Sequence, residues 1–226
     1  MTAPLSQAQS ALPAQTATAG STAAEAGRPG LPTSPLPGIR LVRLDEPWER
    51  PLQRFFEANP SYFLEALGEP PAADAAILEI SDLPPDDFSY TEVFLLGFVQ
   101  EGGELMAMAS VVSDLLAPRV WHIGLFIVAD QRHGTGAAQQ LHGCIQTWAE
   151  RHGAQWMRLG VVVGRARAER FWQRQGYVTT RLREGVEMGQ RTHDLRVMVK
   201  PLGGHTVQDY LLLVARDRPA DWIPPG

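Results

Sequence analysis

The spacing of apolar residues predicts alternating helices and strands between residues 39 and 202. Helical spacing indicates helices after the candidate N-cap Asp45, over 61–67, around 74–80, and in the segments that end at Gly153 and Gly176. Apolar, β-rich runs indicate strands over 39–44, 91–99, 104–113, 120–128, 156–163, 177–183 and 195–199. Because the run 120–128 is apolar on both faces, we expect it in the centre of the sheet. The helix and strand after it would form a right-handed parallel unit, so the pattern predicts an α/β fold.

The two ends of the chain lack this alternation. Residues 1–38 are Ala, Ser, Thr, Gln, Pro and Gly with only Glu25 and Arg28 charged, so we expect a disordered tail. This tail has neither the basic start nor the apolar centre of a secretory signal, so a cytoplasmic location is expected. Residues 203–226 form a C-terminal extension whose amphipathic stretch 207–214 fits a helix or a strand.

Composition narrows the class of protein. The chain has 226 residues and a formal charge of −5, so it can bury a core but lacks the basic excess of most nucleic-acid binders. No apolar run approaches the ~20 residues that cross a bilayer. The single cysteine, Cys144, cannot form an internal disulfide, and no Cys/His cluster has zinc-ligand spacing. We therefore expect no nucleic-acid partner, no membrane span and no metal site.

The most informative stretch is 120–140, where a buried strand runs through a turn with Gly134 and Gly136 into a helix. Two glycines leave backbone N–H groups uncovered at the helix N-terminus, which suits a phosphate. No Walker triplet Gly-Lys-Ser/Thr occurs in the chain. A dinucleotide loop fails because Gln139 replaces its third glycine and the next strand ends without an acidic residue. The turn either binds another anionic group or is a connection without a ligand.

The remaining pattern, Gln/Arg-x-x-Gly-x-Gly/Ala, resembles the acetyl-coenzyme A loop of the GNAT N-acetyltransferase superfamily. It fits in two registers, starting at Gln131 or at His133. The register from His133 is preferred because it places Leu141, Ile145 and Trp148 on the buried face of the helix at the family's distance from the loop.

The later stretch 159–177 is similar to the strand and helix that follow in the family. There Arg165, Ala168, Trp172 and Gly176-Tyr177 occupy the motif positions. The resemblance covers the heart of residues 39–202 and implies a mixed sheet flanked by helices. Its two central parallel strands would splay apart to admit the pantetheine arm of the cofactor.

The resemblance also implies the residues that bind acetyl-coenzyme A. The pantetheine arm would bind backbone groups of the strand, and the loop would bind the pyrophosphate. The implied residues are Phe126, Ile127, Val128, Gln131, Arg132, His133, Gly134, Thr135, Gly136, Ala137 and Ala138, joined by Arg165 and Trp172 from the later stretch.

Two of these residues depart from the family pattern. Many members carry a tyrosine at the Trp172 position that protonates the leaving thiolate, and an indole cannot do this. Trp172 is therefore expected to pack. Arg165 replaces an asparagine, and it either reaches a cofactor phosphate or remains a solvated surface residue.

Three residues are candidates on the acceptor side. His122 is the one titratable residue of the apolar central strand, so it either acts as general base or packs. Asn59 and Tyr62 lie between the two helices that form the acceptor side in the family, where a plain helix-break-helix turn explains them equally well.

Charge is unevenly distributed along the chain: residues 44–114 carry a charge of −13 and residues 165–200 a charge of +5. The acidic region would favour a cationic amine and the basic region the cofactor phosphates, unless the charges are simply solvated.

The sequence predicts an N-acetyltransferase that moves an acetyl group from acetyl-CoA to a primary amine by direct attack. The acceptor would be a small-molecule or peptide amine, and the protein a monomer or homodimer. The alternative is a non-catalytic acyl-CoA sensor or interaction module of the same fold. An unrelated nucleotide-binding α/β protein is a further rival, which stabilisation by coenzyme A but not by NAD or ATP would exclude.

Overall fold

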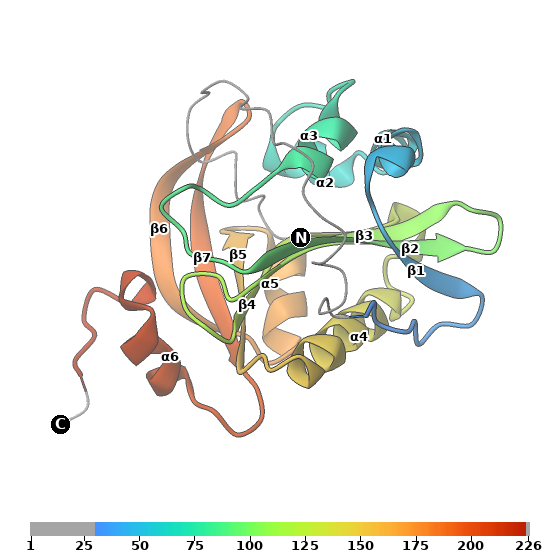
Figure 1. Cartoon of the computed structure of the whole chain (residues 1–226). Coiled ribbons are helices and arrows are strands. Elements are labelled where there is room, and N and C mark those ends of the chain that lie inside the picture. The colour runs from blue at the N-terminus through green and yellow to red at the C-terminus, as the bar shows by residue number, and fades with distance from the viewer. Residues whose placement is uncertain (1–29, 225–226) are drawn as a thin grey trace.

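The computed structural model describes residues 30–224 and centres on a seven-stranded sheet (Figure 1). The strand order is β1-β2-β3-β4-β5-β7-β6, and β4 and β5 form the one parallel pair among the described strands. The strands are β1 (Ile39–Arg43), β2 (Glu92–Gln100), β3 (Leu105–Ser113), β4 (Val120–Val128), β5 (Trp156–Val162), β6 (Val178–Met188) and β7 (Arg191–Pro201). The predicted mixed sheet is confirmed.

Helices cover both faces of this sheet (Figure 1). They are α1 (Glu49–Ala58), α2 (Ser61–Ala66), α3 (Ala75–Ser81), α4 (Ala137–Arg151), α5 (Ala166–Arg174) and α6 (Val207–Leu213). Asp45 lies at the N-cap of a 3-10 turn, Glu46–Trp48, that leads directly into α1, but its side chain makes no capping hydrogen bond. Within the described residues 30–224, no helix is long and apolar enough to cross a membrane.

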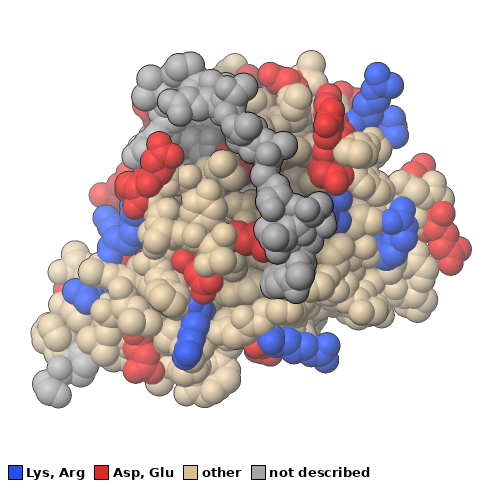
Figure 2. Space-filling view, in the orientation of Figure 1, with Lys and Arg blue, Asp and Glu red and all other residues tan. Residues whose placement is uncertain are grey.

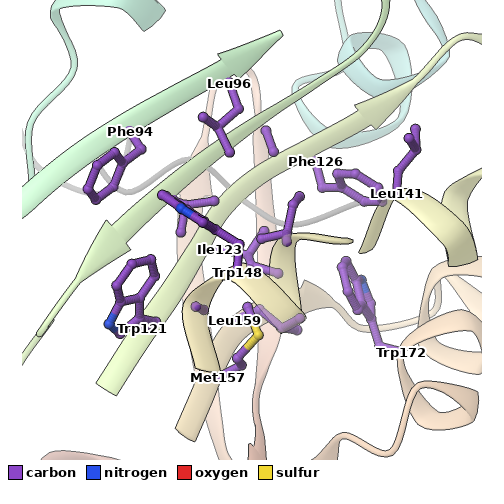
Figure 3. Close-up of a cluster of buried hydrophobic side chains, with 14 of the residues drawn as sticks. Phe94, Leu96, Trp121, Ile123, Phe126, Leu141, Trp148, Met157, Leu159 and Trp172 are labelled. Carbon is purple, nitrogen blue, oxygen red and sulfur yellow. The ribbon is translucent and has the colours of Figure 1, made fainter. Parts of the chain in front are cut away.

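Strand β4 separates two cores because its side chains alternate between the faces. Trp121, Ile123, Phe126 and Val128 pack on the side of α4 and α5, together with Leu141 and Trp148 of α4 in the cluster that Figure 3 draws. Leu125 and Ile127 face α1 and α2. We call the second side the acceptor face, because it carries the α1–α2 turn.

The C-terminal stretch that fitted a helix or a strand is the helix α6. Thr206 and Asp209 form a capping box at its start, in which each side chain accepts the other residue's backbone N–H. Tyr210 and Leu211 are buried against Val120 and Trp156 of the sheet. Residues 203–217 therefore pack on the domain rather than extend from it.

Residues 30–38 also contact the domain. Trp148 Nε1 donates to the Gly30 carbonyl at 2.7 Å, and Cys144 Sγ lies 3.1 Å from the Thr33 carbonyl. Leu36 packs against the core on the α4 side. Residues 30–38, the last part of this tail, therefore form a strap along α4, and residues 1–29 lie outside the described part of the chain.

Candidate acetyl-coenzyme A site

The central parallel strands separate after a short stretch of pairing. Strands β4 and β5 pair only from Val120–Trp156 to Ile123–Leu159, although β4 continues to Val128. A register shift in the β3–β4 pairing lies beside Gly124, at the point where the strands part. The structure therefore contains a gap between the carboxyl halves of these two strands.

Backbone groups of β4 face this gap. In an antiparallel ladder, alternate residues direct both N–H and C=O to the same neighbour. Ala129 N–H donates to Met106 O of β3 at 2.9 Å, so Ile127 also faces β3. Phe126 and Val128 consequently direct their backbone groups into the gap. Of the three predicted strand residues, Phe126 offers both backbone groups there and Val128 its N–H, because the Val128 carbonyl accepts a hydrogen bond from His133 Nε2, and Ile127 is paired with β3.

The loop between β4 and α4 exposes the N-terminus of a long helix. Gly134 and Gly136 have φ of +80° and +84°, which side-chain-bearing residues rarely adopt, and a Cβ on either would meet nothing within 4 Å. Gly136 is the N-cap of the 15-residue helix α4, and no side chain caps it. The N–H of Ala137 makes a long hydrogen bond of 3.4 Å to Thr135 Oγ1, and the helix dipole favours an anion at this N-terminus.

The loop side chains are mostly turned away from this space. His133 Nε2 donates to the Val128 carbonyl at 3.0 Å, Arg132 donates to Gln100 Oε1 at 3.1 Å, and Thr135 Oγ1 donates to the Arg132 carbonyl at 2.7 Å. Burial and the charge of Arg167 lower the pKa of His133, so its neutral form predominates at pH 7. Gln131 is exposed, Ala137 is buried, and Ala138 packs against the core on the α4 side.

Asp130 joins this loop to the turn between α1 and α2. Its N–H donates to Asn59 Oδ1 at 2.7 Å, and its carboxylate accepts a hydrogen bond from Ser61 Oγ at 2.5 Å. Asn59 Nδ2 donates to the Phe55 carbonyl at 2.8 Å. Both ends of the Asn59 amide are therefore engaged within the fold, and Asn59 holds the α1–α2 turn against the cofactor loop.

Arg165 binds α2 at the other side of the gap. Its guanidinium lies 3.5 Å from the Glu65 carboxylate and also donates to the Glu65 carbonyl. This geometry directs Arg165 to α2 rather than to the loop at α4. Helix α2 thus spans the ends of both separated strands, contacting Asp130 after β4 and Arg165 after β5.

Trp172 is fully buried at 0% exposure and brings the two motif stretches together. Its ring lies 5.9 Å from that of Phe126 of β4 and 5.3 Å from that of His142 of α4, measured between centroids. Its indole N–H has no hydrogen-bond partner. The expected packing role is consistent with this environment.

His122 lies at the base of the gap on the acceptor face, and its surroundings do not suit a general base. Arg158 donates to His122 Nδ1 at 3.2 Å, which places the proton of the neutral ring on Nε2. Burial and the Arg158 charge lower the pKa of His122 well below its usual value. Neither nitrogen then offers a free lone pair to an attacking amine.

The partners of this histidine were not predicted from the sequence. Arg158 is itself 5% exposed and forms a two-point ion pair with Asp217, with N–O distances of 2.6 and 3.1 Å. The Tyr210 hydroxyl also donates to Asp217. A lone charge within the apolar strand Trp156–Val162 was a usable signal, because a buried charge requires a partner. Nothing in the sequence points to Asp217 as that partner.

No three or more His, Cys, Asp or Glu residues within the range 30–224 are grouped so that they could hold a metal ion.

Comparisons with solved structures find the same fold at low sequence identity. An acetyltransferase from Thermus thermophilus is 22% identical, with a TM-score of 0.55 and coverage of 73% of this chain and 97% of that one. A chimeric spermidine N-acetyltransferase from Vibrio cholerae and hSSAT is 16% identical, with a TM-score of 0.56 and coverage of 73% and 95%. The ribosomal-protein-S18-alanine N-acetyltransferase from Escherichia coli is 13% identical, with a TM-score of 0.52 and coverage of 74% and 96%.

A search of curated proteins finds no match. The family profile described as Acetyltransferase (GNAT) family matches residues 49–177, which is more than half of the chain and includes both motif stretches. The gap between β4 and β5, the glycine loop and this match agree, and the chain belongs to the GNAT family of acetyltransferases.

Proposed function

We propose that this protein transfers an acetyl group from acetyl-CoA to a primary amine by direct attack, without a covalent enzyme intermediate. The observation that carries the proposal is the gap between β4 and β5, into which Phe126 and Val128 direct backbone groups. The glycine loop at the start of α4 lies directly after the same strand.

Each part of the site has a defined task in this reaction. The N–H groups at the start of α4 bind the pyrophosphate of the acetyl-CoA substrate. A backbone N–H of β4 polarises the thioester carbonyl and stabilises the oxyanion that forms on attack, a contribution of roughly 3 kcal/mol in other enzymes. The remaining acceleration comes from orienting the amine against the thioester.

The leaving thiolate takes its proton from water in this proposal. Trp172 has no acidic proton at neutral pH, but a thiolate of ordinary pKa, ~8.5, can leave without a dedicated acid. Cys144 is not a candidate nucleophile, because it lies within α4, its Sγ contacts the Thr33 carbonyl, and burial raises the pKa of its thiol.

Thioester turnover with a panel of amines tests the proposal. We expect release of free coenzyme A that depends on the amine, with mass spectrometry identifying the acetylated acceptor. The non-catalytic alternative, which the replacement of the family tyrosine by Trp172 favours, predicts coenzyme A binding without turnover for any amine. Absence of coenzyme A binding would contradict both.

A further inference from the structure

Side chains tie β4 to β5 just before the two strands separate. His122 and Arg158 are opposite each other in the parallel register, and the pair Ile123–Leu159 is the last one before the gap. Arg158 Nη1 donates a hydrogen bond to His122 Nδ1 at 3.2 Å. We call this contact the His122–Arg158 bridge. It joins the strands one pair before the gap begins.

The C-terminal segment 203–217 holds the same guanidinium from the other side. Arg158 Nε and Nη2 donate to the two carboxylate oxygens of Asp217 at 2.6 and 3.1 Å, and the Tyr210 hydroxyl also donates to this carboxylate. A guanidinium is planar and rigid, so two bonds to one carboxylate fix the direction of its remaining nitrogen. Asp217 therefore aims Arg158 Nη1 at His122.

Buried polar groups of the acceptor face differ in how they are paired. The Tyr62 hydroxyl is buried and makes no hydrogen bond within residues 30–224. His122, Arg158 and Asp217 instead form one connected set. Figure 2 shows acidic and basic side chains dispersed over the surface, whereas Arg158 and Asp217 are 5% and 1% exposed. Because water does not compete with hydrogen bonds in such a buried set, the bridge can hold the two strands together firmly.

The face of β5 that carries Arg158 becomes open at the next position. Gly160 lies on this face, because its neighbours Leu159 and Val161 pack on the side of α4. A Cβ on Gly160 would meet nothing within 4 Å. The change from bridged to open thus takes place within two residues of β5, and the bridge marks where the opening starts.

We propose that His122, Arg158 and Asp217 are positioning residues that fix the start of the gap, and that the C-terminal segment controls coenzyme A binding through them. The inference rests on the proposed function, in which Phe126 and Val128 bind the cofactor further along the gap. A site whose strands are already held in place loses less conformational freedom when a ligand binds, so the bridge raises affinity. Without the bridge, the point of separation can shift to neighbouring pairs.

Two isosteric substitutions test the bridge. His122→Asn keeps an acceptor at the position of Nδ1, whereas His122→Leu has the same shape and accepts no hydrogen bond. By calorimetry, the Kd for coenzyme A should be at least ~5-fold higher in His122→Leu than in His122→Asn. Peptides of β4 and β5 should also exchange their amide hydrogens at least ~5-fold faster in ligand-free His122→Leu. Equal exchange in the two folded variants would overturn the proposal.

Two further variants separate this role from stability. Leu211→Ala removes buried packing of α6 but leaves the bridge intact, so it should lower stability without changing the Kd. The double change Arg158→Met with Asp217→Leu removes the bridge together with both buried charges, so it should weaken binding although it costs little stability. If the Kd follows stability across these variants rather than the presence of the bridge, the three residues are purely structural and the proposal is wrong.

Hydrogen exchange separates failure of this inference from failure of the proposed function. It is measured without coenzyme A, so its result does not depend on what the protein binds. Absence of coenzyme A binding by the wild type, together with the expected difference in exchange, would contradict only the proposed function. Faster exchange in His122→Leu at an unchanged Kd would overturn the assigned control of cofactor binding.

Discussion

Trp172 fills the position where many GNAT enzymes carry a tyrosine, and the structure gives it a packing environment. Its indole contacts the rings of Phe126, His142 and Tyr177, with centroid distances of 5.9, 5.3 and 5.3 Å. The side chain thereby supports the strand that lines the gap. The proposed reaction needs no proton from the indole, but the packing of the strand needs the volume of this side chain.

Replacing Trp172 by phenylalanine should therefore affect stability more than turnover. We expect Trp172→Phe to lose about 1–3 kcal/mol of unfolding free energy through the cavity it leaves. Turnover should stay within about 3-fold, or about 0.7 kcal/mol of activation free energy. Trp172→Tyr is the comparison, since a phenol can protonate the thiolate and should raise kcat above that of the phenylalanine variant. A loss of turnover in Trp172→Phe at unchanged stability would show that the indole acts in the reaction.

Because of His142 in the same aromatic cluster, the stability of the fold depends on pH. Burial and then the charge of Lys200 lower its pKa to about 3, and its Nε2 is 3.0 Å from the Tyr177 hydroxyl. The unfolded chain binds this proton more readily than the native state, so stability falls as pH drops below ~6.5 and continues to fall towards the native pKa. The raised pKa of Glu79 acts in the opposite direction, because its native carboxyl already holds a proton in this range.

A variant comparison isolates the contribution of His142. His142→Gln keeps a polar partner for Tyr177 but does not titrate. Between pH 6 and 4 its unfolding free energy should fall less steeply than that of the wild type, by about 1.4 kcal/mol per pH unit. Urea denaturation at several pH values measures both slopes. Parallel slopes would mean that His142 is protonated in the native state.

At the scale of elements, the proposed function assigns the pyrophosphate of acetyl-CoA to the turn between β4 and α4. Gly136→Asp should place a carboxylate where the pyrophosphate binds and weaken coenzyme A binding at least ~10-fold, about 1.4 kcal/mol. Gly103→Asp is the matched control for backbone strain, since Gly103 has φ of +85° against +84° for Gly136 and equally open surroundings. Calorimetry on both folded variants should show weaker binding in the first only. Equal binding in the two would remove the loop from the site.

An element could be predicted where it is buried along its whole length, because its sequence is then apolar throughout. Exposed ends of strands and contacts between distant residues could not be predicted in this way. Strand β4 has the predicted bounds Val120–Val128, because burial on both faces requires an unbroken apolar run. Strands β6 and β7 extend beyond their predicted bounds, because many residues of the outer half of this hairpin are exposed and polar and give no apolar signal. The contact of Asn59 with Asp130 spans 71 residues, and no local pattern reports a pairing of that length.

At the scale of the whole molecule, both ends of the described chain stabilise the domain. Asp217, beyond α6, supplies the charge that pairs the buried Arg158 beside the gap. Removing one partner of a buried ion pair leaves the other charge uncompensated, which costs about 3–5 kcal/mol. The C-terminal segment is therefore a structural part of the domain, although the family match ends at residue 177.

Asp217→Leu should therefore destabilise the protein by about 3–5 kcal/mol, whereas the double change Arg158→Met with Asp217→Leu should cost much less. The reason is that the double variant removes both buried charges together. Chemical denaturation of the two variants measures the difference. If the double variant is as unstable as the single one, the loss comes from packing of the C-terminal segment rather than from the unpaired guanidinium.

The N-terminal strap gives the last prediction, which compares two deletions. Removal of residues 1–38 eliminates the hydrogen bond from Trp148 to Gly30 and the packing of Leu36 on the core, and removal of residues 1–29 leaves both in place. One net hydrogen bond and one partly buried leucine are together worth about 1–3 kcal/mol. The shorter protein should have the lower unfolding free energy by that amount, while coenzyme A binding stays the same because the strap contacts the middle of α4 rather than its N-terminus. Equal stability of the two proteins would show that residues 30–38 contribute no net stability in solution, as expected for a disordered tail.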